Sequence, residues 1–277
     1  MILKTFPYII IVDFLIYKLN KNSLNSFYLL YLFMHDDDVA TYMGEKGYTI
    51  IKEFMSVEEQ EFLRNDLTVK PFVPKNSLIK PPSFRVYRES KNKFYIPKFY
   101  GLENYGEPDK ITMKPGKKIN LKFNGTLRDK QKPVVEKFLK NIETKRSGLL
   151  ALHTGFGKTC LGLYLISALK LKTIVIVHKE FLLRQWIERI EQFLPEAKVG
   201  KIQASKINVE DKDIVICMLQ SLSMKDYPKE IFQDFGFAIY DEVHHLGSEV
   251  FSRAFFKLNT EYSLGLSATM KRKDGLT

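Results

Sequence analysis

The sequence contains very little cysteine for its length. Only Cys160 and Cys217 occur among 277 residues, and each stands inside an apolar run, TCLGLYL and IVICML. There is no C-x-x-C pair, and no histidine stands near either cysteine at the spacing of metal ligands. These absences argue against a disulfide framework and a zinc site. They favour two reduced, buried thiols and an intracellular, reducing compartment.

Long apolar runs are missing as well, although the N-terminus is rich in apolar side chains. Residues 1–33 form two short apolar bursts around a Lys/Asn stretch, and Asp13 interrupts the first burst. A membrane-spanning helix needs about 20 apolar residues, and no small-residue cleavage site of a signal peptide follows. A membrane anchor remains the alternative. We expect residues 1–34 to be an extension outside the fold, with Met1 or Met34 as the start and no membrane contact.

Basic residues outnumber acidic ones by 43 to 32, which gives a formal net charge of +11. Clustered Lys and Arg suit a polyanionic partner because they displace counterions from phosphates. A solvated, lysine-rich surface explains the same charge equally well. Basic and aromatic residues interleave over residues 84–95, and this pattern fits a nucleic-acid platform or a hairpin with one solvated basic face.

Residues 35–126 have the texture of short strands and turns. GYTIIKEF (47–54) reads as a strand, and SVEEQEFLRNDL (56–67) as a helix with a capping box formed by Ser56 and Glu59. SFRVYRES and KFYIPKFYG alternate around a polar turn, and Pro115-Gly116 separates two alternating runs in ITMKPGKKINLKF. We therefore expect a small β-rich α+β module with one helix.

From residue 127 to residue 277, short apolar runs alternate with stretches of helical period. Such alternation predicts an α/β domain, with a parallel sheet flanked by helices. The strand candidates are residues 148–153, 172–178, 213–219, 237–242 and 262–269, and the helix candidates are 159–170 and 180–194.

A phosphate-binding loop, T-G-x-G-K-T at 154–159, follows the first of these strands and opens a helix. The glycine that usually opens the longer pattern is replaced by Leu152. Gly155 and Gly157 let backbone N–H groups approach a phosphate. Lys158 is expected to reach the β- and γ-phosphates and Thr159 to ligate Mg²⁺. The alternative is a glycine turn that merely ends a strand.

An acidic pair, Asp241-Glu242, ends the apolar strand FAIYDE and begins DEVHH. Parallel strands emerge at one edge of a sheet, so this pair is expected beside the phosphate loop. Asp241 would hold Mg²⁺ and Glu242 would polarise the attacking water. Together with Lys158, these residues are the catalytic candidates.

These segments resemble motifs of superfamily 2 helicases and translocases. His153–Thr159 is similar to motif I, Asp241–His244 to the D-E-x-H form of motif II, and Ser267-Ala268-Thr269 to motif III. The tail LGLSATMKRKDGLT and the β-rich module resemble the promoter-opening and repair translocases and their relatives in nucleocytoplasmic large DNA viruses. The resemblance implies a RecA-like domain, an ATP hydrolase using Mg²⁺ and, for a viral protein, location in the virion or host cytoplasm. The nucleotide-binding candidates are Arg128, Gln131, His153, Thr154, Gly155, Phe156, Gly157, Lys158, Thr159, Cys160, His244, Ser267 and Thr269.

The resemblance also implies further contacts. LRDKQ (127–131) is similar to an adenine-reading segment, in which Gln131 reads the adenine edge and Arg128 stacks or supports; Lys130 stands where relatives often carry an aromatic. VHKEFLLRQW (177–186) resembles a segment that holds the nucleic-acid backbone, and MLQSL resembles another. The nucleic-acid candidates are Lys179, Arg184, Gln220 and Ser221, with Arg184 also explicable as a residue flanking the core. DNA is favoured slightly over RNA.

Helicases of this superfamily close a second RecA-like domain over ATP, and that domain supplies arginines to the site. No second βα series or Q-x-x-G-R-x-x-R-like segment precedes residue 127, and the sequence stops at Thr277. We therefore expect an N-terminal half of a motor, weak in hydrolysis alone and dependent on a second RecA-like domain or polypeptide. The alternative is a catalytically silent module that binds nucleic acid or a partner. The absence of an LSGGQ-type signature argues against a transporter ATPase.

Overall fold

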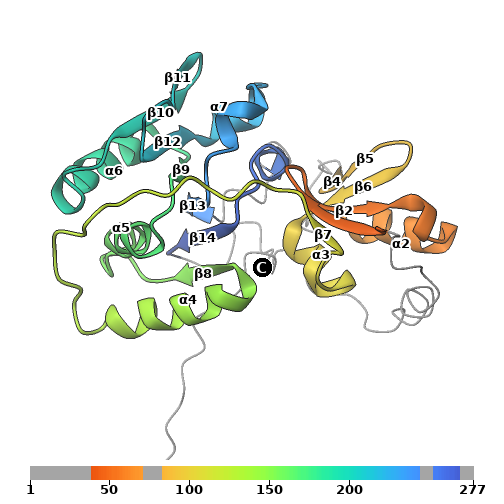
Figure 1. Ribbon diagram of the computed structural model, residues 1–277, viewed down its shortest axis with the longest axis horizontal. Helices are drawn as coiled ribbons and strands as arrows, with labels where there is room; N and C mark the ends of the chain where they lie inside the picture. The colour runs from red at the N-terminus through yellow and green to blue at the C-terminus, as the bar shows by residue number, and fades with distance from the viewer. Residues whose placement is uncertain (1–38, 71–82, 244–251, 269–277) are drawn as a thin grey trace, which may run out of the picture. The chain divides into compact units, whose positions relative to one another are not determined.

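The computed structural model describes residues 39–70, 83–243 and 252–268, and these divide into two compact units (Figure 1). The first unit contains residues 114–243 and 260–268. The second contains residues 39–70, 83–113 and 252–259. The predicted extension, residues 1–34, lies outside the described residues.

A seven-stranded sheet forms the centre of the first unit, in the order β11-β10-β12-β9-β13-β14-β8. Neighbouring strands are parallel, except that β11 runs antiparallel to β10 at one edge. This confirms the predicted parallel sheet. The strands are β8 (Ser147–Ala151), β9 (Thr173–Val177), β10 (Val199–Gln203), β11 (Lys206–Asn208), β12 (Ile214–Met218), β13 (Phe237–Asp241) and β14 (Tyr262–Ser267).

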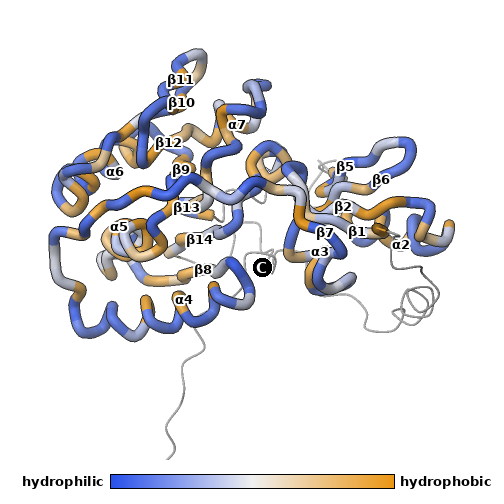
Figure 2. The backbone as a smooth tube through the Cα atoms, viewed as in Figure 1, coloured by the Kyte–Doolittle hydropathy of each residue, from blue (hydrophilic) through white to orange (hydrophobic). Residues whose placement is uncertain are grey.

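Helices flank this sheet (Figure 1). They bury its apolar faces away from water. Every residue of β9 is buried, as expected for a central strand of a parallel sheet. Figure 2 shows mostly hydrophobic positions along α5 and mostly hydrophilic ones along α4. None of the helices in the described ranges is long and apolar enough to cross a bilayer. The helices are α4 (Lys132–Lys145), α5 (Lys158–Leu169), α6 (Glu180–Phe193), α7 (Leu219–Met224) and the 3₁₀ turn η2 (Lys229–Phe232).

The second unit is built on a mostly antiparallel five-stranded sheet in the order β5-β6-β2-β1-β7, with a separate β3-β4 pair. The predicted capping box is confirmed: the Ser56 hydroxyl accepts from the Glu59 N–H, and the Glu59 carboxylate accepts from the Ser56 N–H. The elements are β1 (Thr41–Gly44), β2 (Gly47–Ile51), η1 (Lys52–Phe54), α2 (Val57–Asp66), β3 (Thr68–Val69), β4 (Phe84–Arg85), β5 (Arg88–Glu89), β6 (Lys93–Ile96), α3 (Lys98–Tyr105), β7 (Lys110–Ile111) and η4 (Arg253–Phe256).

Two predictions for this region are wrong. KFYIPKFYG was expected to be a strand, but the strand ends at Ile96 and a second α-helix, α3, begins after Pro97. The two alternating runs on either side of the predicted Pro115-Gly116 turn do not pair with each other. Instead Ile119 donates its N–H to the Lys170 carbonyl, and Lys118 makes an isolated bridge with Leu171. The second run therefore pairs with a distant loop of the first unit rather than with its sequence neighbour.

The chain path between the units differs from a simple succession of domains. Ile119 and Leu121, from the stretch grouped by sequence with the N-terminal module, lie in the core of the first unit. Residues 252–259 belong to the second unit, where Asn259 donates to the Gly44 carbonyl oxygen and Arg88 lies over the Phe256 ring. The chain then returns to the first unit at Thr260.

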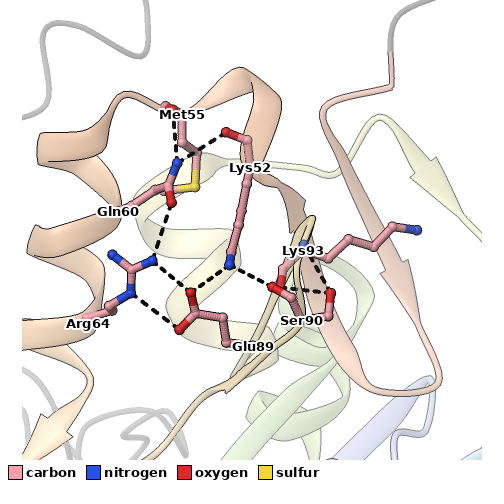
Figure 3. Close-up of polar contacts among 7 residues, drawn as sticks. All are labelled: Lys52, Met55, Gln60, Arg64, Glu89, Ser90 and Lys93. Carbon is pink, nitrogen blue, oxygen red and sulfur yellow. Dashed lines mark hydrogen bonds and ion pairs between the residues drawn. The ribbon is translucent and has the colours of Figure 1, made fainter.

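Polar side chains on the second unit converge on one carboxylate (Figure 3). Lys52 Nζ lies 2.6 Å from Glu89 Oε1, and Arg64 Nη2 lies 2.7 Å from the same oxygen. Gln60 accepts a further bond from Arg64. The Arg64 hydrogen bond is the main cause that lowers the pKa of Glu89 to about 2. Glu89 thus links η1, α2 and β5 through charge.

Candidate functional site

The phosphate loop connects β8 directly to α5. Leu152 is buried, and its N–H donates to the Ser267 carbonyl at 2.9 Å, so it extends the strand pairing by one residue. Gly155 (φ 81°) and Gly157 (φ 96°) both adopt backbone angles that favour glycine. Gly157 is the N-cap of α5 and has no side chain to occupy the helix N-terminus. The loop therefore leaves N–H groups and the positive end of a helix available to an anion.

Arg128 and Gln131 support this loop from behind. Gln131 donates from Nε2 to the Phe156 carbonyl at 2.8 Å, and Arg128 donates to the same oxygen. Gln131 is 1% exposed, and its Oε1 accepts the Arg128 N–H at 2.9 Å. A Cβ at Gly157 would lie 2.6 Å from Gln131 Nε2, so a glycine is needed where the two segments meet. The adenine-reading role of Gln131 stays a prediction.

Lys158 and Asp241 are brought together although 83 residues separate them. Lys158 Nζ donates to the Leu152 carbonyl at 3.1 Å, which connects the two ends of the loop. Asp241 ends β13, and β14 separates β13 from β8 in the sheet. Burial raises the pKa of the Asp241 carboxyl above its ordinary value, and the nearby Lys158 charge acts in the opposite direction. The loop after β8 and the acidic end of β13 thus lie at the same edge of the parallel sheet.

The Asp241 carboxylate is held by two donors from different elements. Trp186 of α6 donates from Nε1 to Oδ2 at 2.9 Å, and the Glu242 N–H donates to Oδ1 at 3.0 Å. Glu242 itself adopts φ 52°, a left-handed conformation that is costly for a residue with a side chain. Backbone strain of this kind clusters at functional sites.

Trp186 was not among the site residues predicted from the sequence. Its position in an amphipathic helix predicted a core residue, and it is fully buried. A buried indole N–H needs an acceptor, which was the signal that a polar partner lay nearby. The sequence did not reveal that this partner is Asp241.

The other nucleotide-binding candidates lie around the same loop. His153 and Thr154 are exposed, and His153 Nδ1 lies 2.8 Å from the Thr154 carbonyl oxygen. Thr159 and Cys160 follow Lys158 in the first turn of α5, both partly buried. Ser267 is buried at the end of β14. His244 and Thr269 lie outside the described residues.

The residues fit a metal that takes only part of its coordination from protein. Asp241 presents a carboxylate and Thr159 a hydroxyl, which are oxygen ligands of the kind Mg²⁺ prefers. Within the described ranges, no group of three or more His, Cys, Asp or Glu side chains is placed to hold a metal ion. An ion held here would depend on nucleotide oxygens and water for its remaining ligands, as is common for Mg²⁺.

The nucleic-acid candidates come from two segments that hydrogen bonds connect. Lys179 is the N-cap of α6, and Arg184 is exposed on the same helix, 3.9 Å from Glu180. Gln220 of α7 donates to the His178 carbonyl at 2.7 Å, directly before Lys179. The beginnings of α6 and α7 are therefore neighbours.

A hairpin turn adjoins these segments. The Ser221 hydroxyl accepts the Ala204 N–H at 2.9 Å, and Tyr227 donates to the Ala204 carbonyl at 2.7 Å. Gln203 donates to Glu180 in the first turn of α6. Sequence reasoning missed both this β10–β11 turn and Phe181, an aromatic side chain that is 60% exposed beside Lys179.

The family described as "Type III restriction enzyme, res subunit" matches residues 124–272, which include the loop, Trp186 and Asp241. This chain belongs to that family. The superfamily 2 helicase resemblance read from the motifs is thereby confirmed.

Relatives of this restriction-enzyme helicase family occur in viruses and archaea. The chain is 38% identical over 245 residues to "Putative ATP-dependent RNA helicase L396" of Acanthamoeba polyphaga mimivirus, covering 87% of this chain and 47% of that protein. It is 35% identical over 149 residues to "DNA 3'-5' translocase XPB2" of Sulfurisphaera tokodaii, covering 54% of this chain and 32% of that protein. The chain thus spans about a third to a half of these relatives.

A solved structure shares the fold. The UvsW helicase from bacteriophage T4 aligns with a TM-score of 0.55 and 18% identity, covering 84% of this chain and 93% of that chain. This likeness concerns the fold alone and agrees with the RecA-like sheet described above.

Proposed function

We propose that this chain binds Mg-ATP and a nucleic-acid backbone as part of an ATP-dependent superfamily 2 motor. The observation that carries the proposal is the glycine loop between β8 and α5, which leaves the helix N-terminus without a side-chain cap in the same sheet as the strand that ends at Asp241. A cation, an anion-binding helix end and a metal-binding carboxylate are the parts that phosphoryl transfer requires. The family membership and the helicase names of the relatives support the same reading.

Each part of the site has a distinct role in this proposal. The backbone around Gly155 and Gly157 cradles the β-phosphate, and Lys158 exchanges its bond with the Leu152 carbonyl for the β- and γ-phosphates. Asp241 and Thr159 hold Mg²⁺, which neutralises phosphate charge when bound. Glu242 orients and polarises the attacking water.

The nucleic-acid interface is assigned to the beginnings of α6 and α7. Lys179 and Arg184 supply charge to the backbone of DNA or RNA, and Gln220 and Ser221 fix the surrounding segments through their bonds to His178 and Ala204. Contacts of this kind position a strand without reading its sequence. Arginines from a second RecA-like domain, in the same protein or in a partner, would be needed for full turnover.

The test is ATP turnover by the full 277-residue chain, measured alone and with single-stranded DNA, duplex DNA or RNA. We expect weak turnover that nucleic acid stimulates and that Lys158→Ala lowers by a factor on the order of 10²–10³. Turnover no higher than that of Lys158→Ala under every condition would instead favour a silent binding module. Strand separation by this chain alone would contradict the need for a second RecA-like domain.

A further inference from the structure

Trp186 contacts the candidate metal carboxylate from the interior of the protein. Its Nε1 lies 2.9 Å from Asp241 Oδ2, and its ring is fully buried. The donor and the acceptor come from α6 and β13, which are 55 residues apart in sequence. A hydrogen bond from α6 therefore fixes the position of one oxygen of the Asp241 carboxylate.

The second oxygen is set independently. Oδ1 accepts the Glu242 N–H at 3.0 Å, so each carboxylate oxygen has one donor. An ionised carboxylate offers about four lone-pair positions in all. Two donors on two oxygens fix the plane of the group and leave the remaining positions for a ligand outside the core.

The indole cannot easily move away from this position. A Cβ at Gly162 of α5 would lie 3.0 Å from Trp186 Cη2 and 3.4 Å from Ile239 Cδ1. The ring thus occupies the space that glycine leaves on the helix following the phosphate loop, next to the strand that carries Asp241. Packing against α5 and β13 restricts rotation of the indole ring and so fixes the direction of its N–H.

We propose that Trp186 is a positioning residue, whose indole N–H holds Asp241 in the orientation that takes up Mg²⁺ with the nucleotide. This inference rests on the proposed function, in which Asp241 holds that ion. Residues that hydrogen-bond a metal ligand from behind commonly change metal affinity about 10–100-fold when replaced. A purely structural role for Trp186 predicts loss of stability without any change in the metal requirement.

Trp186→Phe keeps a buried six-membered aromatic ring and removes the N–H donor together with the five-membered ring, so the control must also remove buried volume from this helix. Binding of a fluorescent N-methylanthraniloyl derivative of ATP is measured as Mg²⁺ is titrated, and again in EDTA. We expect the Mg²⁺ midpoint to rise about 10-fold or more, with affinity in EDTA unchanged. Ile190→Val, a buried change on the same helix, is the matched control and should leave the midpoint in place.

A midpoint for Trp186→Phe within about twofold of wild type would overturn the inference while leaving the proposed function standing. Absence of any Mg²⁺-dependent nucleotide binding by the wild-type chain would overturn the proposed function, and this inference with it. Thermal denaturation of both variants shows whether they fold.

A second measurement needs no change at Trp186, because it is the only tryptophan in the chain. Adding Mg²⁺ to the ATP-bound wild-type protein should alter tryptophan emission. Asp241→Asn keeps an acceptor for the indole but loses the charge, so its emission should not respond. Emission of the wild-type protein that is indifferent to Mg²⁺ while nucleotide binding depends on Mg²⁺ would count against the role of Trp186.

Discussion

Two carboxylates, one in each unit, are held in opposite ways. Glu89 is surrounded by Lys52 and Arg64, and hydrogen bonds to these cations lower its pKa to about 2. Asp241 is held by the neutral N–H groups of Trp186 and Glu242, and burial raises its pKa. The cations around Glu89 neutralise its charge, whereas the N–H groups around Asp241 orient the carboxylate without neutralising it.

This difference affects what each carboxylate can still attract. A carboxylate already paired with two cations has little left to offer an external ion, so Glu89 contributes mainly to local stability. A buried carboxylate with neutral donors keeps its attraction for a metal or a lysine. We therefore expect changes in the first unit to alter binding before stability, and changes around Glu89 to do the reverse.

The largest effect is expected for Lys158→Ala. The variant loses the cation that we propose for the nucleotide phosphates, and removing one preorganised charge donor typically costs on the order of 10²–10³ in rate. ATP turnover should fall by about that factor. Lys140→Ala, an exposed change on α4, should leave turnover unaltered. An equal loss of turnover in both variants would mean that Lys158 has no special role in the site.

Gly157→Ala tests whether nucleotide binding depends on the contact of the loop with Arg128 and Gln131. Gly155→Ala is the matched control. Both positions have left-handed backbone angles, which cost a residue with a side chain about 1–2 kcal/mol. A Cβ at Gly157 would also meet Arg128 Nη2 at 2.8 Å, whereas one at Gly155 has nothing within 4 Å. We expect nucleotide affinity to fall further in Gly157→Ala, measured by titration with labelled ATP. Equal losses would mean that contact with Arg128 and Gln131 is unimportant.

Glu89→Gln tests whether the charge network of the second unit contributes to stability alone. The amide cannot pair with two cations, and a partly exposed network of this size is worth about 1 kcal/mol. Denaturant unfolding of the second unit should shift by that amount, with nucleotide affinity unchanged. The exposed Glu107→Gln serves as control and should shift neither quantity. Reduced nucleotide affinity in Glu89→Gln would show that the network is not merely structural.

The same network predicts a weaker pH dependence. Because the folded-state pKa of Glu89 is lowered, its stabilising contribution is complete above the unfolded value of about 4.3. The contribution is lost as the pH falls towards about 2. The stability difference between wild type and Glu89→Gln should therefore shrink between about pH 6 and about pH 3. A difference that grows on acidification would contradict the lowered pKa.

Much of the first unit could be predicted because its signals are local. Continuous apolar runs marked the buried strands, and the spacing of Gly155, Gly157 and Lys158 marked the loop. Ser56 and Glu59 likewise cap their helix through neighbours three residues apart. Each of these patterns depends on residues that are close in sequence.

Two of the failures have a different cause. The run after Gly116 alternates like a strand, yet distant backbone at Lys170 provides its partners. Trp186 read as an ordinary core residue until β13 placed Asp241 against its N–H. In both cases the deciding partner lies more than 50 residues away, where local periodicity carries no information.

The path of residues 252–259 makes the domains discontinuous in sequence. The chain contributes β13 to the first unit, supplies Ala254, Phe256 and Leu258 to the second as buried residues, and then returns to form β14. A single cleavage after Met113 would therefore divide the second unit, because Phe256 and Asn259 would stand on a different fragment from their partners Arg88 and Gly44. The chain between β13 and β14 passes through the second unit, so the second unit is completed by residues that follow β13 and is not a separate N-terminal segment.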